Sequence, residues 1–305
     1  MSIDVTMIGE LTLDEVVHED GPCHWKQLGG GALYSAIGAL AWGARPSISA
    51  TIGEDYPEER LEQLESAGVD TSQIHRIDGA SLSLWLLYEA EGRRHQVPKE
   101  SSSSFATLDY ARPEPRLTPP PLGVHVAPQT TEGQLRALDS LAAVPGLVVT
   151  QDLLVEPFVD RQPYLDGRAM RGTTAFLPSE QEVHQLWGEV DAAGLATNLR
   201  RLAGIEHLVI KRGPSGADVI GPHQVVRVPP AVTEVVDTTG AGDAFCGGFL
   251  VGLIETDDPV EATIRGAVSA ALAVETLGAD AALRVAAPRE SHRRADTLRA
   301  TLARA

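Results

Sequence analysis

Short apolar runs alternate with longer amphipathic segments along this chain. Six of the runs lack polar alternation, which is typical of strands in a parallel sheet that is covered on both faces. They lie at Val5–Ile8, Ile48–Ile52, Gly123–Ala127, Leu147–Thr150, Thr174–Leu177 and His207–Ile210. Helical spacing predicts helices at Ala32–Trp42, Pro57–Ala67, Glu132–Ala143, Asp191–Ala203, Asp243–Ile254 and Pro259–Leu277. This order predicts a doubly wound α/β fold, with a mainly parallel sheet flanked by helices.

Two segments break the alternation. Val16–Gln27 and Ser81–Val97 have extended patterns, and the second has the form of a hairpin with a turn at Glu91-Gly92. A small sheet of this kind is only marginally stable alone, so we expect it to pack on the rest of the chain. An edge hairpin of the main sheet is the alternative.

Composition limits the class of protein. The 305 residues are 43% hydrophobic, enough for one large domain or two ordinary ones. No apolar run approaches the roughly 18 residues of a membrane span, and residues 1–4 lack a basic flank and an apolar signal core, so we expect no signal peptide. Two cysteines, Cys23 and Cys246, fit a reducing compartment, so we expect a cytoplasmic protein. The net charge of −17 argues against nucleic-acid binding.

The most informative string is Asp-Thr-Thr-Gly-Ala-Gly-Asp at residues 237–243. Gly240, Ala241 and Gly242 precede Asp243, which opens an apolar helical run. The amides at a helix N-terminus bind anions, and small residues let a phosphate approach them. An anion cradle beside a carboxylate suits transfer of a phosphoryl group to a hydroxyl. For the turn alone, a plain helix cap with Asp243 facing the helix dipole is the alternative.

This string resembles the signature of the ribokinase-like (phosphofructokinase-B) sugar and nucleoside kinases. The resemblance implies that Asp243 is the base that takes the proton of the acceptor hydroxyl, and that the three preceding amides form the anion hole. It implies ATP and Mg²⁺, and a hydroxyl, in first place a primary CH₂OH, of a small sugar, sugar acid or nucleoside. It also implies that carbonyls at Asp237 and Thr238 can hold a monovalent cation such as K⁺.

The N-terminal motifs resemble the acceptor site of the same family. Asp14 matches the substrate-binding carboxylate, although alone it has the pattern of a solvated loop acid. Gly29 and Gly30 match the glycine pair that lets the substrate approach the backbone. Tyr34 stands where the family usually has Asn, which leaves the identity of the substrate open. Arg94 matches an arginine in the return strand of the hairpin.

The resemblance extends to the nucleotide site. Ser179 replaces the Asn of an Asn-x-x-Glu motif whose acid, Glu182, is kept and would organise Mg²⁺ through water. The alternative for this pair is a helix N-cap by Ser179. Lys211 and Arg212 border the turn that faces the ATP phosphates, and each is either a phosphate partner or a surface cation. The other ATP-site residues that the resemblance implies are Gly213, Gly216 and Glu275.

The resemblance covers nearly the whole chain and implies a single kinase domain over residues 1–305. The two extended segments, about residues 15–28 and 80–100, then form a small β-sheet lid that can also make a homodimer contact. Trp85 and Tyr88 are lid core, interface or substrate contacts. We therefore expect an ATP-dependent carbohydrate or nucleoside kinase that acts on a small molecule, without nucleic-acid or membrane partners. The alternative is a ligand-binding protein that keeps the fold without the chemistry.

Overall fold

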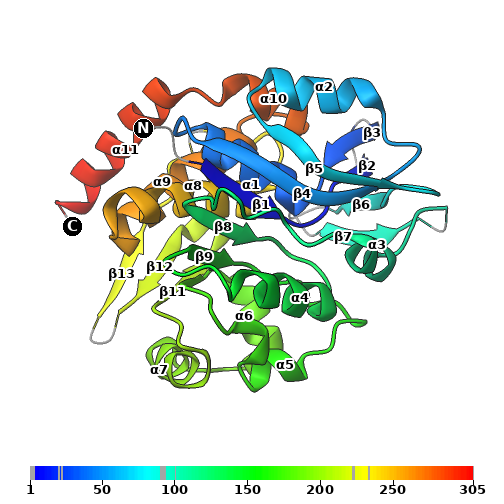
Figure 1. The fold of residues 1–305 in the computed structure, drawn as a ribbon. Coiled ribbons are helices and arrows are strands. Elements are labelled where there is room, and N and C mark those ends of the chain that lie inside the picture. Colours follow the sequence, from blue (N-terminus) through cyan, green and yellow to red (C-terminus); the bar gives the residue numbers. More distant parts are fainter. Residues whose placement is uncertain are drawn as a thin grey trace.

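One large sheet organises the molecule. The computed structural model describes residues 4–19, 21, 23–89, 94–99, 101–221, 224–232 and 234–304. In sequence order, the strands of this sheet are β1 (Asp4–Ile8), β4 (Arg45–Gly53), β5 (Asp70–Ile77), β8 (Gly123–Val126), β9 (Val148–Gln151), β10 (Ala175–Phe176), β11 (His207–Lys211), β12 (Ala217–Ile220) and β13 (Val225–Val228). They are arranged as β13-β12-β11-β10-β9-β8-β1-β4-β5 (Figure 1). All neighbouring pairs are parallel except β11–β12 and β12–β13. The predicted mainly parallel sheet is confirmed.

Helices cover both faces of this sheet (Figure 1). On one side lie α1 (Gly31–Leu40), α8 (Ala241–Thr256), α9 (Pro259–Val274), α10 (Gly278–Val285) and α11 (Pro288–Leu302). On the other lie α4 (Thr131–Leu141), α5 (Gln162–Leu165), α6 (Glu180–Trp187) and α7 (Ala192–Ala203). The two remaining α-helices of the described residues are α2 (Glu58–Ser66) and α3 (Phe105–Ala111). Adjacent strand residues serve the two faces: Met7 belongs to the core under α1 and α8, and Ile8 to the core under α4.

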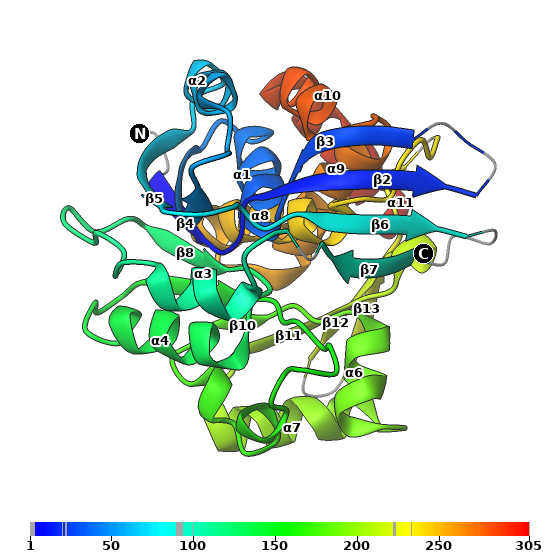
Figure 2. The ribbon, with the colours of Figure 1, turned by 90° about the vertical axis from the view of Figure 1, so that its right-hand side faces the viewer.

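The two extended segments form a sheet of their own, here called the small sheet. It consists of β3 (Cys23–Gly29), β2 (Thr12–His18), β6 (Leu84–Tyr88) and β7 (Arg94–Pro98), in that order. The β2–β6 pair is parallel and the other two pairs are antiparallel. It lies beside the main sheet rather than on its edge (Figure 2), so the predicted small sheet is confirmed and the edge hairpin is wrong. Its inner face packs on α3 through an apolar cluster.

The helix predicted over Pro259–Leu277 ends earlier, at Val274. The reason is a contact with the segment that precedes α8. The amides of Val236 and Asp237 both donate to the carbonyl oxygen of Val274, at 2.7 and 3.1 Å. The amide of Gly278, which would continue the helix, donates instead to the Asp237 carboxylate at 3.3 Å. The end of α9 thereby holds the loop that leads into α8.

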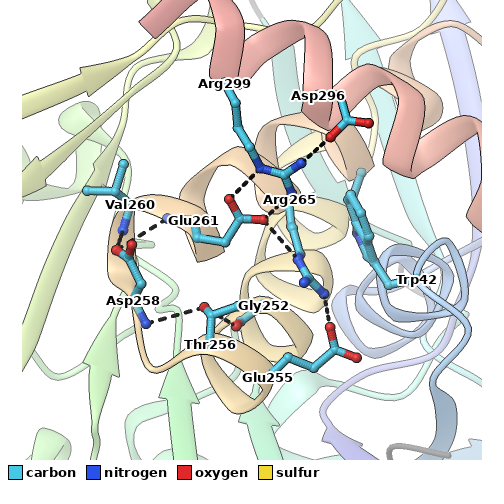
Figure 3. Close-up of polar contacts among 11 residues, drawn as sticks. Trp42, Gly252, Glu255, Thr256, Asp258, Val260, Glu261, Arg265, Asp296 and Arg299 are labelled. Carbon is cyan, nitrogen blue, oxygen red and sulfur yellow. Dashed lines mark hydrogen bonds and ion pairs between the residues drawn. The ribbon is translucent and has the colours of Figure 1, made fainter. Parts of the chain in front are cut away.

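A buried arginine ties α8, α9 and α11 together (Figure 3). Arg265 of α9 is ion-paired with Glu255 of α8 and with Glu261 of its own helix, and its guanidinium lies 5.0 Å from the ring centre of Trp42. Glu261 also accepts from Arg299 of α11. Arg299 of the C-terminal helix is thereby anchored to α9. None of the helices in the described part of the chain is long and apolar enough to cross a membrane.

Candidate active site

The N-terminus of α8 begins against an aromatic ring. Gly240 precedes the helix with a φ of 71°, and a Cβ there would lie 2.1 Å from Cγ of Tyr34. Both the left-handed backbone and the close ring require glycine at this position. Asp243 lies in the first turn of this 16-residue helix, where backbone amides point out of the helix end and carry a partial positive charge.

The glycines that open α1 lie against two carboxylates. A Cβ at Gly29 would be 2.0 Å from Oδ2 of Asp14, and a Cβ at Gly31 would be 2.9 Å from Oδ1 of Asp243. Bare backbone is therefore what allows Asp14 and Asp243 to flank the same turn. The structure thus brings together Asp14, Gly29, Tyr34 and Asp243, which come from segments far apart in the sequence.

A small cavity of about 10 Å³ lies between the small sheet and the α8 side of the molecule. Residues that line it include Asp14, Val16 and Leu86 of the small sheet, Tyr34 of α1, and Asp237 and Thr239 of the loop before α8. Such a volume admits about one water molecule.

The Tyr34 side chain is buried beside this cavity. Burial raises the pKa of its phenol well above the ordinary value, and the nearby carboxylates of Asp237 and Asp14 raise it further. The hydroxyl consequently stays protonated at neutral pH and remains able to donate a hydrogen bond.

The loop at residues 237–239 is fixed from several sides. The Asp237 carboxylate accepts from the Thr239 amide at 2.9 Å and from the Thr239 hydroxyl at 2.7 Å. The Thr239 oxygen is also hydrogen-bonded to the phenol hydroxyl of Tyr88 in the small sheet. Of the two aromatic residues whose roles the sequence left open, Tyr88 points inward to this loop, whereas Trp85 contacts Trp25, with ring centres 5.8 Å apart.

A largely buried lysine approaches α8 from the main sheet. Lys211, the last residue of β11, is ion-paired with Asp152, and its Nζ would be 3.4 Å from a Cβ at Gly242. Burial lowers the pKa of Lys211, but the Asp152 carboxylate outweighs that effect and raises it above the ordinary value, so the ammonium stays charged. The Lys211 side chain is only 12% exposed and lies at the start of α8, which does not fit a surface cation, and its contact with phosphate stays a prediction.

Asp152, which follows β9 and is buried, is a further residue of this region that the sequence motifs did not predict. Burial raises the pKa of Asp152 above its ordinary value, and the charge of Asp243 raises it further. The charge of Lys211 lowers this pKa but does not outweigh the effect of burial. A single acid after an apolar run forms no motif, so only its position at the same sheet edge as Lys211 reveals it. Burial and the charge of Asp152 also raise the pKa of Glu182 to about 6.

Ser179 and Glu182 form a reciprocal helix cap. The Glu182 amide donates to the Ser179 hydroxyl at 3.2 Å, and the Ser179 amide donates to Oε2 of Glu182 at 2.6 Å. The N-cap alternative is therefore what the structure shows for this pair. Because a carboxylate has a second oxygen, the cap alone does not prevent Glu182 from binding a water molecule.

Other predicted site residues have partners of their own. Arg212 pairs with Glu180 and Asp218, next to the Gly213–Ser215 turn and Gly216. Glu275 caps α9 and pairs with Arg294 at 2.8 Å. The side chain of Arg94 lies outside the described residues. Within the ranges that the structure describes, no three His, Cys, Asp or Glu side chains are grouped to hold a metal ion.

Comparison with known proteins gives consistent matches. The model of the pfkB family carbohydrate kinases matches residues 142–286. A cytidine kinase of Thermococcus kodakarensis is 29% identical over 265 residues, which are 86% of this chain and 92% of that kinase. An ATP-dependent 6-phosphofructokinase of Thermoanaerobacterium thermosaccharolyticum is 36% identical over 268 residues, 83% of this chain and 82% of that enzyme.

A solved structure shows the same fold. Ribokinase from Cryptococcus neoformans var. grubii serotype A, in complex with ADP, has a TM-score of 0.74 at 20% identity and covers 96% of this chain and 100% of its own. The expected ribokinase-like fold and the expected ATP-dependent kinase class are confirmed at this level. The chain belongs to the pfkB family of carbohydrate kinases.

Proposed function

We propose that this protein transfers the γ-phosphoryl group of ATP to a hydroxyl of a small sugar, sugar acid or nucleoside, in first place a primary CH₂OH. One observation carries the proposal: Asp243, in the first turn of α8, lies against the same glycine turn as Asp14. A base, an anion-binding helix end and a second carboxylate for hydroxyl groups are thereby gathered at one point.

The roles follow from this arrangement. Asp243 accepts the proton of the acceptor hydroxyl while that oxygen forms a bond to the γ-phosphorus, and the bond from phosphorus to the β-phosphate oxygen breaks. The amides of Gly240, Ala241 and Gly242 balance the charge on the transferring group, and the Lys211 ammonium adds charge at Gly242. Asp14 accepts hydrogen bonds from further hydroxyls of the acceptor.

The ATP phosphates are assigned to the side of the α8 N-terminus on which Lys211 lies beside Gly242. The remaining nucleotide contacts would come from Ser179, Gly213, Gly216 and Glu275. Mg²⁺ neutralises phosphate charge when bound, and it commonly uses one or two carboxylates with water and substrate phosphates, for which Glu182 is available through water. Carbonyls at Asp237 and Thr238 are the proposed K⁺ ligands. The Asp237 carboxylate is not assigned to K⁺, because it already accepts hydrogen bonds from the amides of Thr239 and Gly278.

We assign the small sheet, about residues 15–28 and 80–100, as a lid of a single cytoplasmic kinase domain over residues 1–305. The cavity between it and the α8 side supports this role. Gly29, Gly30, Tyr34 and Arg94 complete the proposed acceptor site. The outward pair Trp25 and Trp85, of which Trp25 is 56% exposed, is where a homodimer contact would form.

The test is ADP release from MgATP across pentoses, hexoses, sugar acids and nucleosides, with Asp243→Asn as the matched variant. Because one relative is named cytidine kinase and another 6-phosphofructokinase, the panel also includes a hexose phosphate beside the nucleosides. We expect one class to react, and turnover to fall roughly 10²–10⁴-fold in the variant while acceptor binding is kept. Full turnover in Asp243→Asn would remove Asp243 as the base. Ligand-induced stabilisation without ADP release from any acceptor would favour the ligand-binding alternative.

A further inference from the structure

The small sheet makes one polar contact directly beside the proposed anion hole. Tyr88, at the end of β6, is buried, and its phenol hydroxyl is hydrogen-bonded to Oγ1 of Thr239. Thr239 immediately precedes Gly240. We infer that this hydrogen bond fixes the geometry of the anion hole, which makes Tyr88 and Thr239 positioning residues for phosphoryl transfer. The inference rests on the proposed transfer at Asp243.

The direction of the hydrogen bond can be assigned. The Thr239 hydroxyl has one hydrogen, and this hydrogen is directed to Oδ1 of Asp237 at 2.7 Å. The same carboxylate oxygen accepts the Thr239 amide at 2.9 Å. Tyr88 is therefore the donor to Thr239, because the threonine oxygen has only acceptor capacity left. The resulting chain runs from Tyr88 through Thr239 to Asp237, and its last member is bound to Gly278 at the start of α10.

The contact matters because the anion hole begins one residue later. Gly240 has left-handed backbone and lies directly on the Tyr34 ring, so it has little space to adjust. A displacement of Thr239 is thus passed to the amides that follow. Such amides stabilise a developing negative charge only when they lie about 2.7–3.1 Å from the oxygen that carries it.

The position of the Tyr88 hydroxyl depends on the position of the small sheet. The Tyr88 carbonyl accepts from the Glu19 amide at 3.0 Å, and its ring stacks on His18 with centres 5.0 Å apart. Tyr88 therefore moves with β2 and β6 as one unit. When the small sheet moves away from α8, Thr239 keeps its bonds to Asp237 and loses Tyr88. The hydrogen bond thus couples the position of the small sheet to the positions of the amides that form the anion hole.

Tyr88→Phe tests this role, because it removes only one oxygen atom. We expect kcat to fall roughly 5–10-fold, which corresponds to the loss of one ordinary hydrogen bond, with less than a two-fold change in KM for acceptor and MgATP. Tyr88→Phe should have no further effect in a Thr239→Val background, because that variant already lacks the acceptor. Thr239→Ser keeps the hydroxyl and should restore wild-type kcat.

The matched control is Tyr164→Phe. The Tyr164 hydroxyl is also buried, but among the described residues it has no hydrogen-bond partner, so its removal should leave kcat unchanged. A second readout does not depend on activity. Amide hydrogen exchange over residues 237–243 should be faster in Tyr88→Phe than in wild type and unchanged in Tyr164→Phe.

The outcomes separate this inference from the proposed function. Unchanged kcat or unchanged exchange in Tyr88→Phe would overturn the positioning role and leave the kinase assignment intact. If wild type transfers phosphate to no acceptor, yet exchange over 237–243 still rises in the variant, the proposed reaction fails while the hold of Tyr88 on the loop is supported.

Discussion

At the scale of single residues, the glycine turn at the start of α1 shows how the lack of side chains leaves space for the groups of a site. Backbone at Gly29 lies where a Cβ would overlap Asp14 and Thr12, and backbone at Gly31 lies against Asp243. The family resemblance explains such glycines by the approach of the substrate. Here the contacts with the chain's own carboxylates already require them, so the turn sets the spacing between acceptor-binding and catalytic groups.

Replacing Gly29 by Ala should therefore impair acceptor binding selectively. The new Cβ would lie 2.0 Å from Oδ2 of Asp14, so the carboxylate has to move away from its hydroxyl partners. Hydrogen bonds to a charged group are worth roughly 1.5–3 kcal/mol, which corresponds to a rise of about 10- to 100-fold in acceptor KM. Steady-state kinetics should show an unchanged KM for MgATP.

Gly194→Ala in α7 is the control, because its Cβ would approach only the end of the Asp191 side chain at 3.2 Å. An unaltered acceptor KM in a folded Gly29→Ala protein would show that Asp14 does not bind the acceptor.

The ion pair between Lys211 and Asp152 could not be predicted from the sequence. Lys211 is visible as a cation near a glycine turn, but whether it is buried depends on Asp152, which is 59 residues away. A sequence motif contains only residues that are close to one another along the chain. Lys211 and Asp152 meet across the edge of a parallel sheet and form no such motif, so Asp152 could be found only from the fold.

At the scale of elements, the apolar strands and amphipathic helices were predictable because burial on both faces imposes their patterns. Three strands of the main sheet were missed for physical reasons. The edge strand β5 (Asp70–Ile77) has only exposed and half-buried residues, and β12 and β13 are short antiparallel strands of four residues each. The early end of α9 was also unpredictable, since it depends on the loop before α8.

The Arg265 network predicts how α8, α9 and α11 are held together. Arg265 is 6% exposed, so Arg265→Ala removes its ion pairs and the contact with Trp42 from a nearly dry environment. We expect a loss of about 2–3 kcal/mol in the free energy of unfolding, which is less than for a fully buried pair because Glu255 can regain water. Urea unfolding measures the change, and kcat should stay near that of wild type.

Arg299→Ala is the comparison for this network. The Arg299 side chain is 37% exposed, so its pairing with Glu261 should contribute no more than about 1 kcal/mol. Equal losses in the two variants would contradict the central role of Arg265.

At the scale of the whole molecule, the proposed site is an assembly of distant segments. Asp14, Tyr34, Asp237 and Thr239 line one cavity, and Tyr88 reaches Thr239, only because the small sheet lies over the start of α8. The sequence indicated the chemistry of each segment through the family signature. The lateral contacts among them, including the hydrogen bond from Tyr88 to Thr239, depend on how two sheets pack and could not be predicted from any one motif.

Global stability should respond to pH through a histidine in the core. His125 of β8 is fully buried, and its Nδ1 is hydrogen-bonded to Oγ1 of Thr150 at 2.9 Å. Burial, with a smaller contribution from the charge of Lys211, lowers its pKa to about 3. In the unfolded chain a histidine titrates near 6.5. As the pH falls below about 6.5, His125 binds a proton in the unfolded state but not in the folded state. The free energy of unfolding therefore decreases progressively until about pH 3.

This linkage amounts to roughly 2 kcal/mol of lost stability at pH 5 relative to pH 8. Urea unfolding of wild type and His125→Asn at the two pH values isolates it, because the other titrating groups are common to both proteins. Asn can keep a hydrogen bond to Thr150 and does not titrate, so the variant should lose about 2 kcal/mol less than wild type. His184→Asn, whose side chain is 62% exposed in wild type, should behave as wild type does. If wild type and His125→Asn lose the same stability between pH 8 and pH 5, the core histidine is not what couples folding to acid.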